Sequence, residues 1–227
     1  MKKQLLAAAI AAFAVSGVAV AHEAGDVILR VGVAHVAPDV NSGKISTGLT
    51  GKIPGTKADV DSNTQLGLTA TWIVAPHLGV EVLAATPFTH DIKVKGLPGD
   101  FAAANGKFGK ATHLPPTVSA QYFFLDPKSK FQPYVGLGLN YTIFFNEKLA
   151  GREKTLGFHG LDLENSWGLA AQIGADVAIT DRLFLNAAVW KIDINTTATS
   201  RHEALGKVKV DVDIDPWVYF FGVGYKF

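Results

Sequence analysis

Apolar and polar residues alternate along residues 131–146, which read FQPYVGLGLNYTIFFN. The odd positions are almost all large and apolar, whereas the even positions include Gly136, Gly138 and Asn140. A period of two is typical of a β-strand whose two faces meet different surroundings. The stretch therefore predicts a strand with one bulky apolar face and one face of small or polar residues.

The same alternation recurs along the chain and predicts eight strands. They cover residues 26–36, 64–74, 78–90, 114–124, 131–145, 169–179, 182–197 and 217–227. Short turn-forming connections alternate with long ones that are rich in Gly, Lys and Asp. The long connections span residues 37–62, 91–112, 147–164 and 198–208. This alternation places all long loops at one end of an all-β, eight-stranded, antiparallel up-and-down sheet, which can close into a barrel.

The bulk of the two faces indicates which one points outward. Large apolar side chains suit a hydrocarbon solvent, whereas small residues fit the interior of a narrow barrel. A soluble eight-stranded barrel is the alternative, with its polar face outside. Aromatic residues gather towards strand ends, as at Tyr141, Phe145 and Tyr225, where a membrane interface is expected. We therefore expect a transmembrane barrel, with the terminal Phe227 acting as a signal for outer-membrane assembly.

The first 21 residues have the pattern of a secretory signal. Lys2 and Lys3 precede an apolar run over residues 5–20, and small residues at 19 and 21 suit cleavage before His22. An N-terminal membrane anchor is the alternative. Residues 22–227 then form one domain with 19 Lys and Arg against 20 Asp and Glu, a balance that gives no electrostatic case for nucleic acid. The absence of cysteine means that no disulfide stabilises an exported chain.

Residue patterns for catalysis and cofactor binding are absent. No G-x-S-x-G motif occurs, and Ser119, His113 and Asp126 show no alignment as a triad. The histidines show no spacing typical of metal ligands, being scattered at positions 35, 77, 90, 113, 159 and 202. We expect no enzyme activity, no cofactor and no metal.

Several strings spread over the whole chain resemble the OmpW family of outer-membrane proteins. They are HEAG from His22, NTQLGLT from Asn63, GVEVLAATPF from Gly79, HLPPT from His113, FQPYVG from Phe131, DINTT from Asp193 and DPWV from Asp215. The resemblance implies an eight-stranded barrel with a hydrophobic lumen and a role in uptake of small apolar molecules. It also implies that Leu83 and Trp167 close the channel. Simple alternation, however, places Trp167 with Leu169 on the lipid face, unless a bulge intervenes near Gly168.

The alternation also predicts what lines the interior. Large apolar residues fall on inward faces, namely Phe144, Phe184, Trp190, Ile192 and Phe220. We expect them to make the outer half of the lumen apolar, although side chains of this size could equally fill a solid core.

Polar residues on inward faces predict a plug in the periplasmic half. They are Arg30, Glu81, Gln121, Gln172, Asp176 and Lys226. Because buried charges need partners, we expect arginine or lysine to pair with carboxylate there. A plug of this kind would block the axial path and direct an apolar ligand sideways into the membrane.

A sideways route needs an opening in the wall. Pro87, Pro115 and Pro116 lack the N–H that a strand ladder uses, so they predict a lateral opening. Strands that simply end at these prolines are the alternative explanation.

The predicted function is a channel or transporter in the bacterial outer membrane, with both termini in the periplasm. A small hydrophobic ligand enters from the extracellular loops and leaves laterally. The expected partners are outer-membrane lipid, lipopolysaccharide and the barrel-assembly machinery, and the expected state is a monomer. A structural or adhesive surface barrel, with the loops as its working part, is the alternative function.

Overall fold

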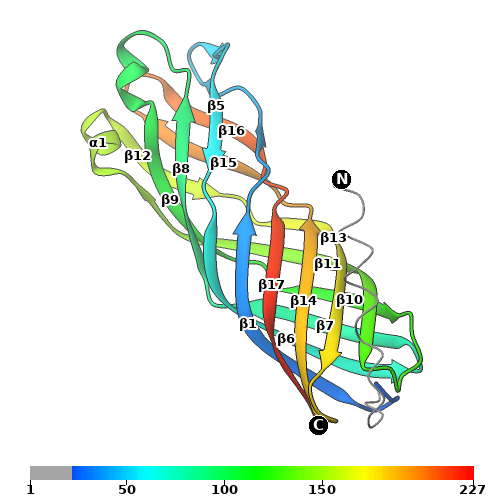
Figure 1. Ribbon diagram of the computed structural model, residues 1–227. Helices are drawn as coiled ribbons and strands as arrows, with labels where there is room; N and C mark the ends of the chain where they lie inside the picture. Colours follow the sequence, from blue (N-terminus) through cyan, green and yellow to red (C-terminus); the bar gives the residue numbers. More distant parts are fainter. Residues whose placement is uncertain (1–21) are drawn as a thin grey trace, which may run out of the picture.

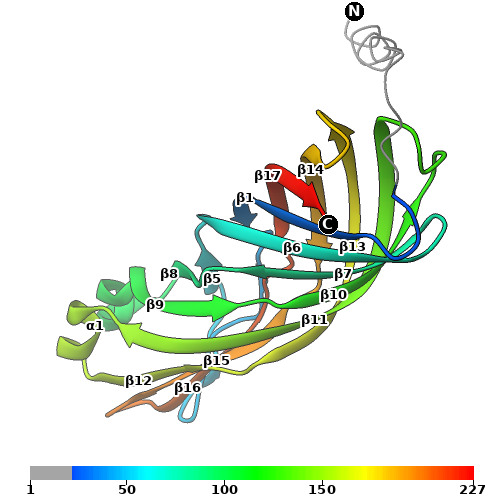
Figure 2. The same cartoon turned by 90° about the horizontal axis from the view of Figure 1, so that it is seen from below.

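Eight long antiparallel strands close into a barrel (Figures 1 and 2). The computed structural model describes residues 22–227, so the predicted signal peptide, residues 1–21, lies outside the described residues. The barrel strands are β1 (Val27–Ala37), β6 (Asn63–Ala75), β7 (Leu78–Ala85), β10 (Thr117–Phe123), β11 (Phe131–Leu149), β13 (Ser166–Ala178), β14 (Leu183–Ile192) and β17 (Trp217–Lys226). Each pairs with the next, and β17 pairs with β1 to close the ring. The predicted all-β, eight-stranded up-and-down barrel is thereby confirmed.

Both ends of the described chain lie at the end of the barrel that carries the short turns, here called the short-turn end. The His22 N–H donates to the Pro127 carbonyl at 3.0 Å, and Pro127 lies in the turn between β10 and β11. The Phe227 N–H donates to the Val27 carbonyl at 2.9 Å, and its ring contacts Tyr225. The opposite end is called the long-loop end.

The four long connections are largely strands, so their prediction as loops was wrong. They contain β2 (Asn41–Ser42), β3 (Ser46–Thr47), β4 (Gly51–Lys52), β5 (Lys57–Val60) and β12 (Phe158–Leu163), and they overlap β8 (Phe88–Lys95), β9 (Gly106–Leu114), β15 (Asn195–His202) and β16 (Gly206–Asp213). β8 pairs with β5 and β9, and β9 with the upper half of β11, while β15 joins β12 to β16. These pairings extend the wall beyond the eight-stranded barrel, towards the long-loop end (Figure 1).

Among residues 22–227, helical structure is limited to η1 (Gly99–Ala104) and α1 (Gly151–Thr155). No helix within residues 22–227 has both the length and the apolar character needed to cross a membrane.

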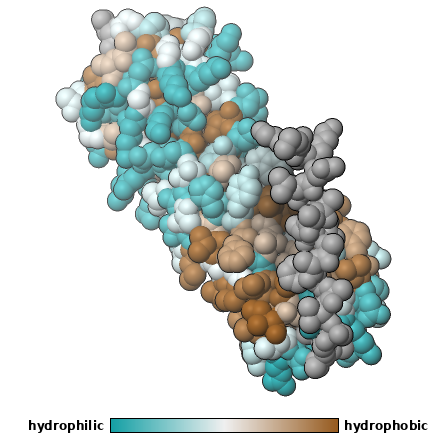
Figure 3. All heavy atoms as spheres, viewed as in Figure 1, coloured by the Kyte–Doolittle hydropathy of each residue, from teal (hydrophilic) through white to brown (hydrophobic). Residues whose placement is uncertain are grey.

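The strand faces are oriented as the alternation of β11 predicted. Leu137 and Leu139 are exposed on the outer surface, whereas Asn140 is fully buried inside. A Cβ atom on Gly138 would lie 2.3 Å from the Val118 carbonyl oxygen, so the close approach of β10 requires a glycine there. Figure 3 shows an apolar belt on the visible face of the barrel, between a hydrophilic short-turn tip and a hydrophilic long-loop half.

Candidate ligand passage

A buried ion-pair cluster fills the interior of the barrel near the short-turn end. Arg30, on β1, is fully buried, and its Nε donates to Asp176 Oδ1 at 2.9 Å while Nη2 donates to Asp176 Oδ2. Asp176 lies on β13, on the opposite wall. Two parallel bonds between a guanidinium and a carboxylate give the strongest form of this pair. The cluster therefore ties opposite sides of the barrel together across its axis.

Other polar side chains complete this cluster, which we call the polar floor. Arg30 Nη1 donates to Thr71 Oγ1 at 2.7 Å and lies 3.4 Å from Glu81 Oε2. Gln172 Nε2 donates to Glu81 Oε1 at 3.1 Å, and Gln121 Oε1 accepts from Thr71 at 3.1 Å. Five of the six residues predicted for the periplasmic plug thus meet here. Hydrogen bonds and ion pairs link them inside the barrel, as the predicted pairing of charges requires.

The sixth, Lys226, lies apart from the polar floor. It occupies the inward face of β17 at the rim of the short-turn end, and its Nζ is 3.5 Å from Asp26 Oδ2. Lys226 is the last residue of β17, so its side chain reaches Asp26 at the rim and not the polar floor.

His22 is a floor residue that sequence reasoning missed. Its ring is buried between Phe123 and Phe184, with centroid distances of 5.1 and 5.2 Å, and its Nε2 is 3.0 Å from Asp176 Oδ2. Phe184 therefore lies at the short-turn end and lines no part of the outer lumen, which corrects its assignment. Alternation predicted its inward direction correctly but carried no information on its depth in the barrel.

An apolar layer separates the polar floor from the upper interior. Trp190 and Phe220 are both buried, and their rings meet edge to face at a centroid distance of 6.3 Å. Both point inward as predicted, yet they pack against each other and border none of the cavities described below. Their role in the structure is to pack the barrel interior between the polar floor and the cavities.

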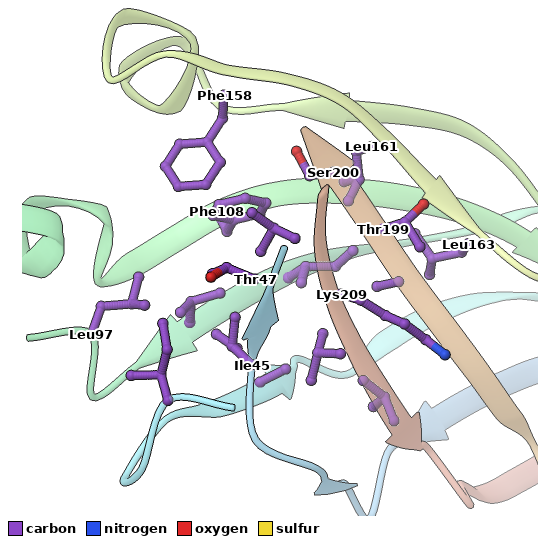
Figure 4. A pocket seen from close by; sticks show the side chains of 18 of the residues that line it. Ile45, Thr47, Leu97, Phe108, Phe158, Leu161, Leu163, Thr199, Ser200 and Lys209 are labelled. Atoms are coloured by element: carbon purple, nitrogen blue, oxygen red, sulfur yellow. The ribbon is translucent and has the colours of Figure 1, made fainter. Parts of the chain in front are cut away.

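Three adjoining apolar cavities occupy the interior above this layer. The upper cavity lies between the strands of the long-loop half and comprises about 850 Å³ of space that is partly open to solvent (Figure 4). The middle cavity comprises about 420 Å³ of such space and shares Val60, Ile92, Leu163 and Ile214 with the upper one. The lower cavity comprises about 280 Å³ of such space and shares Val36 with the middle one. The cavities thus form a series from the long-loop end to the level just above the apolar layer.

Three of the residues predicted to line the lumen or close it border these cavities. Phe144 borders the middle cavity, and Leu83 and Ile192 border the lower one. The upper cavity is walled by apolar residues that fall in the long connections, such as Phe108, Phe158 and Leu161 (Figure 4). Alternating stretches such as KVKVDVD, residues 207–213, carried a signal for these walls.

Trp167 lies outside the barrel, which corrects its assignment as a channel residue. Its side chain is 70% exposed, and its ring contacts Tyr141 at a centroid distance of 4.4 Å. β13 runs in unbroken register with β11 through this residue, so no bulge turns the side chain inward. Its ring therefore lies on the outer surface of the barrel, where an aromatic residue suits contact with lipid.

The barrel wall is interrupted beside the lower cavity. The ladder between β7 and β10 ends at the pair Leu83 and Thr117, and the next pair is Phe88 with His113 between β8 and β9. No strand pair joins residues 84–87 to residues 114–116. The carbonyls of Pro115 and Pro116 accept from the side chain of Asn140 on β11, on the side away from β7. We call this break the wall interruption.

Small or proline residues border the wall interruption on both sides. Pro87 and Pro116 are exposed on the outer surface, whereas Pro115 is buried and borders the lower cavity. Ala84 is exposed on the outside and also borders that cavity. The wall between cavity and exterior is therefore thin here, because methyl groups and proline rings form it.

Two histidines that are far apart in the sequence meet at the middle cavity. His90 Nε2 and His113 Nε2 are 3.0 Å apart, and His90 Nδ1 lies 2.5 Å from the Asp61 carbonyl oxygen. The outward neighbours at this level, Thr89 and Thr112, are polar, which places the pair above the apolar belt. Burial lowers the pKa of His113 to about 3, with a further contribution from His90, and burial also lowers the pKa of His90.

This pair shows that the histidines are not all scattered, contrary to the sequence interpretation. Residues 90 and 113 come together because β8 and β9 pair with Phe88 opposite His113 and His90 opposite Ala111, which makes the histidines diagonal neighbours. Within residues 22–227, no group of three or more His, Asp and Glu side chains is arranged to hold a metal ion.

Comparisons with known proteins agree with this architecture. The OmpW family model matches residues 23–227. Outer membrane protein W of Vibrio cholerae is 43% identical over 227 residues, which is the full length of both chains. The crystal structure of the outer membrane protein OprG from Pseudomonas aeruginosa matches with a TM-score of 0.87 and 48% identity, covering 91% of this chain and 98% of that one.

A more distant relative is the dibenzothiophene metabolism operon protein PahQ of Pseudomonas aeruginosa. It is 25% identical over 199 residues, covering 87% of each chain. The family match spans almost all of the described residues and the barrel agrees with a solved relative, so this chain belongs to the OmpW family of bacterial outer-membrane proteins.

Proposed function

We propose that the chain is a channel for small hydrophobic molecules, which enter at the long-loop end and leave sideways into the membrane. The observation that carries the proposal is the series of apolar cavities that lies above the polar floor. An interior of this kind excludes ions and water but accommodates an apolar molecule, because apolar cavities stay dry and bind apolar ligands.

The polar floor supports a lateral exit over an axial one. A ligand moving along the axis would have to displace the pair of Arg30 and Asp176 and leave charges without partners, at a cost of several kcal/mol. A ligand in the lower cavity already lies beside the wall interruption at Ala84 and Pro115. The lower-energy route leads through the interruption, whose edges lack ladder hydrogen bonds.

The cavity walls support an apolar cargo. The residues that border the lower cavity are all apolar. Two of them, Leu83 and Phe88, also belong to the buried hydrophobic core of the barrel. The relative PahQ belongs by its name to an operon for metabolism of dibenzothiophene, a planar apolar molecule. A cargo of this class fits the cavities without requiring a charged partner.

Substitution of Leu83 by arginine tests the proposal. The side chain is 5% exposed and borders the lower cavity. An arginine there would occupy the cavity and place a charge in it, which disfavours the binding of apolar molecules. We expect uptake of a hydrophobic fluorescent tracer into vesicles to fall to nearly the level of empty vesicles. Leu49→Arg is the matched control, because Leu49 is 73% exposed and borders none of the three cavities.

Assembly of both variants is checked by heat-dependent gel migration. Unchanged uptake by an assembled Leu83→Arg barrel contradicts the passage. If wild-type vesicles take up no more tracer than empty ones, the chain acts instead as a structural or adhesive barrel, and its extended long-loop half becomes the surface to study.

A further inference from the structure

We propose that His113 gives the passage a hydrogen-bonding station, so that it selects planar aromatic molecules carrying one N–H or O–H donor over equally large molecules without a donor. This inference rests on the proposed function and specifies its preferred ligand. The station is the His90–His113 pair at the middle cavity, together with the rings of Phe88 and Phe144.

The hydrogen bonds of the pair define which nitrogen atoms carry protons. The Asp61 carbonyl can only accept, so His90 Nδ1 is the donor in their 2.5 Å contact. A neutral His90 then has an unprotonated Nε2, which accepts from the Nε2–H of His113 at 3.0 Å. This leaves His113 with an unprotonated Nδ1, an acceptor.

That acceptor has no partner. His113 is 7% exposed, and its Nδ1 makes no hydrogen bond with any of the described residues. A buried polar atom without a partner is uncommon, since most find one in the protein or in ordered water. An acceptor without a partner on a ring that borders an apolar cavity is suited to a donor that arrives with a ligand.

The histidine remains an acceptor at physiological pH. Burial holds the pKa of His113 at about 3, so the ring is neutral and its Nδ1 lone pair is free. The carboxylate of Asp61 lies on the side of His90, whose own pKa is lowered by burial. No proton uptake by the pair interferes with ligand recognition near pH 7.

Aromatic rings surround this acceptor and define the shape of the ligand. Phe88 stacks on His113 at a centroid distance of 5.5 Å, and Phe144 lies 5.7 Å from it. His113 and Phe144 both border the middle cavity, whose remaining walls include Val36 and Ile194. Planar aromatic ligands gain from stacking on such rings beyond the area that they bury.

Recognition requires a small motion of the ring. His113 Nδ1 is covered by protein atoms, so the proposal includes a rotation of the His113 side chain into the cavity that it borders. The rotation is possible because open space lies next to the ring.

Binding of two probes of matched shape tests the proposal. The wild-type protein in lipid nanodiscs is titrated with 2-naphthol, which has an O–H donor, and with 2-methoxynaphthalene, which has none. Binding to empty nanodiscs is subtracted. One net hydrogen bond corresponds to about a fivefold preference for 2-naphthol. The ¹⁵N resonance of His113 Nδ1 is expected to shift with 2-naphthol alone.

The variant His113→Phe keeps a stacked ring but removes the acceptor. It should bind 2-methoxynaphthalene as the wild type does and lose the preference for 2-naphthol. His35→Phe is the control, because His35 lies on the outward face of β1, with its Nδ1 2.8 Å from Thr64 Oγ1.

Each outcome separates this inference from the proposed function. Equal binding of both probes to the wild type, or a preference that persists in His113→Phe, overturns the station but leaves the apolar passage intact. If neither probe binds above the level of empty nanodiscs, the proposed function fails and the station fails with it.

Discussion

The two halves of the barrel interior have the same alternation of inward and outward residues, but their inward residues differ in polarity. Near the short-turn end the inward residues are polar, and Arg30, Asp176 and Glu81 fill the axis with hydrogen bonds. Towards the long-loop end the inward residues are apolar and leave three adjoining cavities. The first half is therefore filled by a hydrogen-bonded polar cluster, whereas the second contains apolar cavities.

The difference shows that an inward-facing position does not by itself make a lumen. Polar groups attract partners across a narrow barrel and close it, because a buried charge without a partner is costly. Apolar groups form no directional bonds, so a wall of them can remain open where side chains do not fill the space. The Trp190 and Phe220 layer, where apolar rings do fill it, marks the boundary between the halves.

The largest expected effect comes from breaking the polar floor. Arg30→Leu leaves Asp176 and Glu81 buried without their cation, so the free energy of unfolding should fall by about 3–5 kcal/mol. Urea unfolding in detergent micelles, followed by tryptophan fluorescence, measures the loss.

A triple variant in which Arg30, Glu81 and Asp176 all become leucine sharpens the result. It removes every charge of the cluster together, and much of the lost stability should return. A single variant as stable as the wild type would show that the floor is not held by this ion pair.

Closing the wall interruption should have the next largest effect, this time on transport. Continuing the register beyond Leu83 and Thr117 places Ala84 opposite Pro116. The chain contains no cysteine, so a disulfide between Ala84→Cys and Pro116→Cys forms without competing thiols. We expect uptake of the hydrophobic tracer to fall several-fold and to recover on reduction.

A second tether provides the control for the first. Val82 and Val118 are paired within the continuous ladder of β7 and β10, so cysteines at these positions join strands that are already joined. Uptake should be the same before and after their oxidation. A formed disulfide across the interruption that leaves uptake unchanged would exclude this exit.

The third expected effect is on acid stability, and it belongs to the apolar half. The ordinary pKa of His113 is 6.5, whereas burial holds it at about 3 in the folded chain. Between these values the unfolded chain binds more protons, so stability falls as the pH falls from about 6.5 to about 3 and this contribution levels off below.

Comparison with His113→Phe isolates this contribution. Asp59 and Asp211, whose pKa values are lowered by hydrogen bonds with Lys95 and Thr197 respectively, also lose stabilising interactions in acid, but both proteins share that loss. The unfolding free energy of the wild type should therefore fall more steeply with acid than that of the variant. Parallel pH profiles would mean that His113 titrates normally in the folded chain.

Strand faces were predictable from the sequence because they depend on neighbouring residues only. Leu137 points outward and Asn140 inward, as the period of two requires. The same rule placed Trp167 on the outer face, and the structure agrees with it against the channel role that family resemblance implied. The rule also applied to residues 91–95 of β8 and to β16, whose alternation outside the eight predicted strands was overlooked.

Depth along the barrel axis was less predictable. Phe184 and Ile192 alternate on the same strand and both point inward, yet Phe184 packs below the polar floor against His22 while Ile192 borders a cavity. Strand alternation fixes the side of a residue but not its height relative to residues on other strands. Height depends on the register between strands, and so on every pairing around the ring.

The alternation, the short turns and the inward charges were enough to indicate a closed barrel with a polar plug, because each is a local property of the chain. The meeting of His90 with His113, the docking of His22 under Asp176 and the break between β7 and β10 were not accessible in this way. Arg30 and Asp176 are separated by 146 positions, and their contact exists only because the ring closes in one register. Long-range register is a cooperative result of all eight pairings, and a single strand carries too little information to set it.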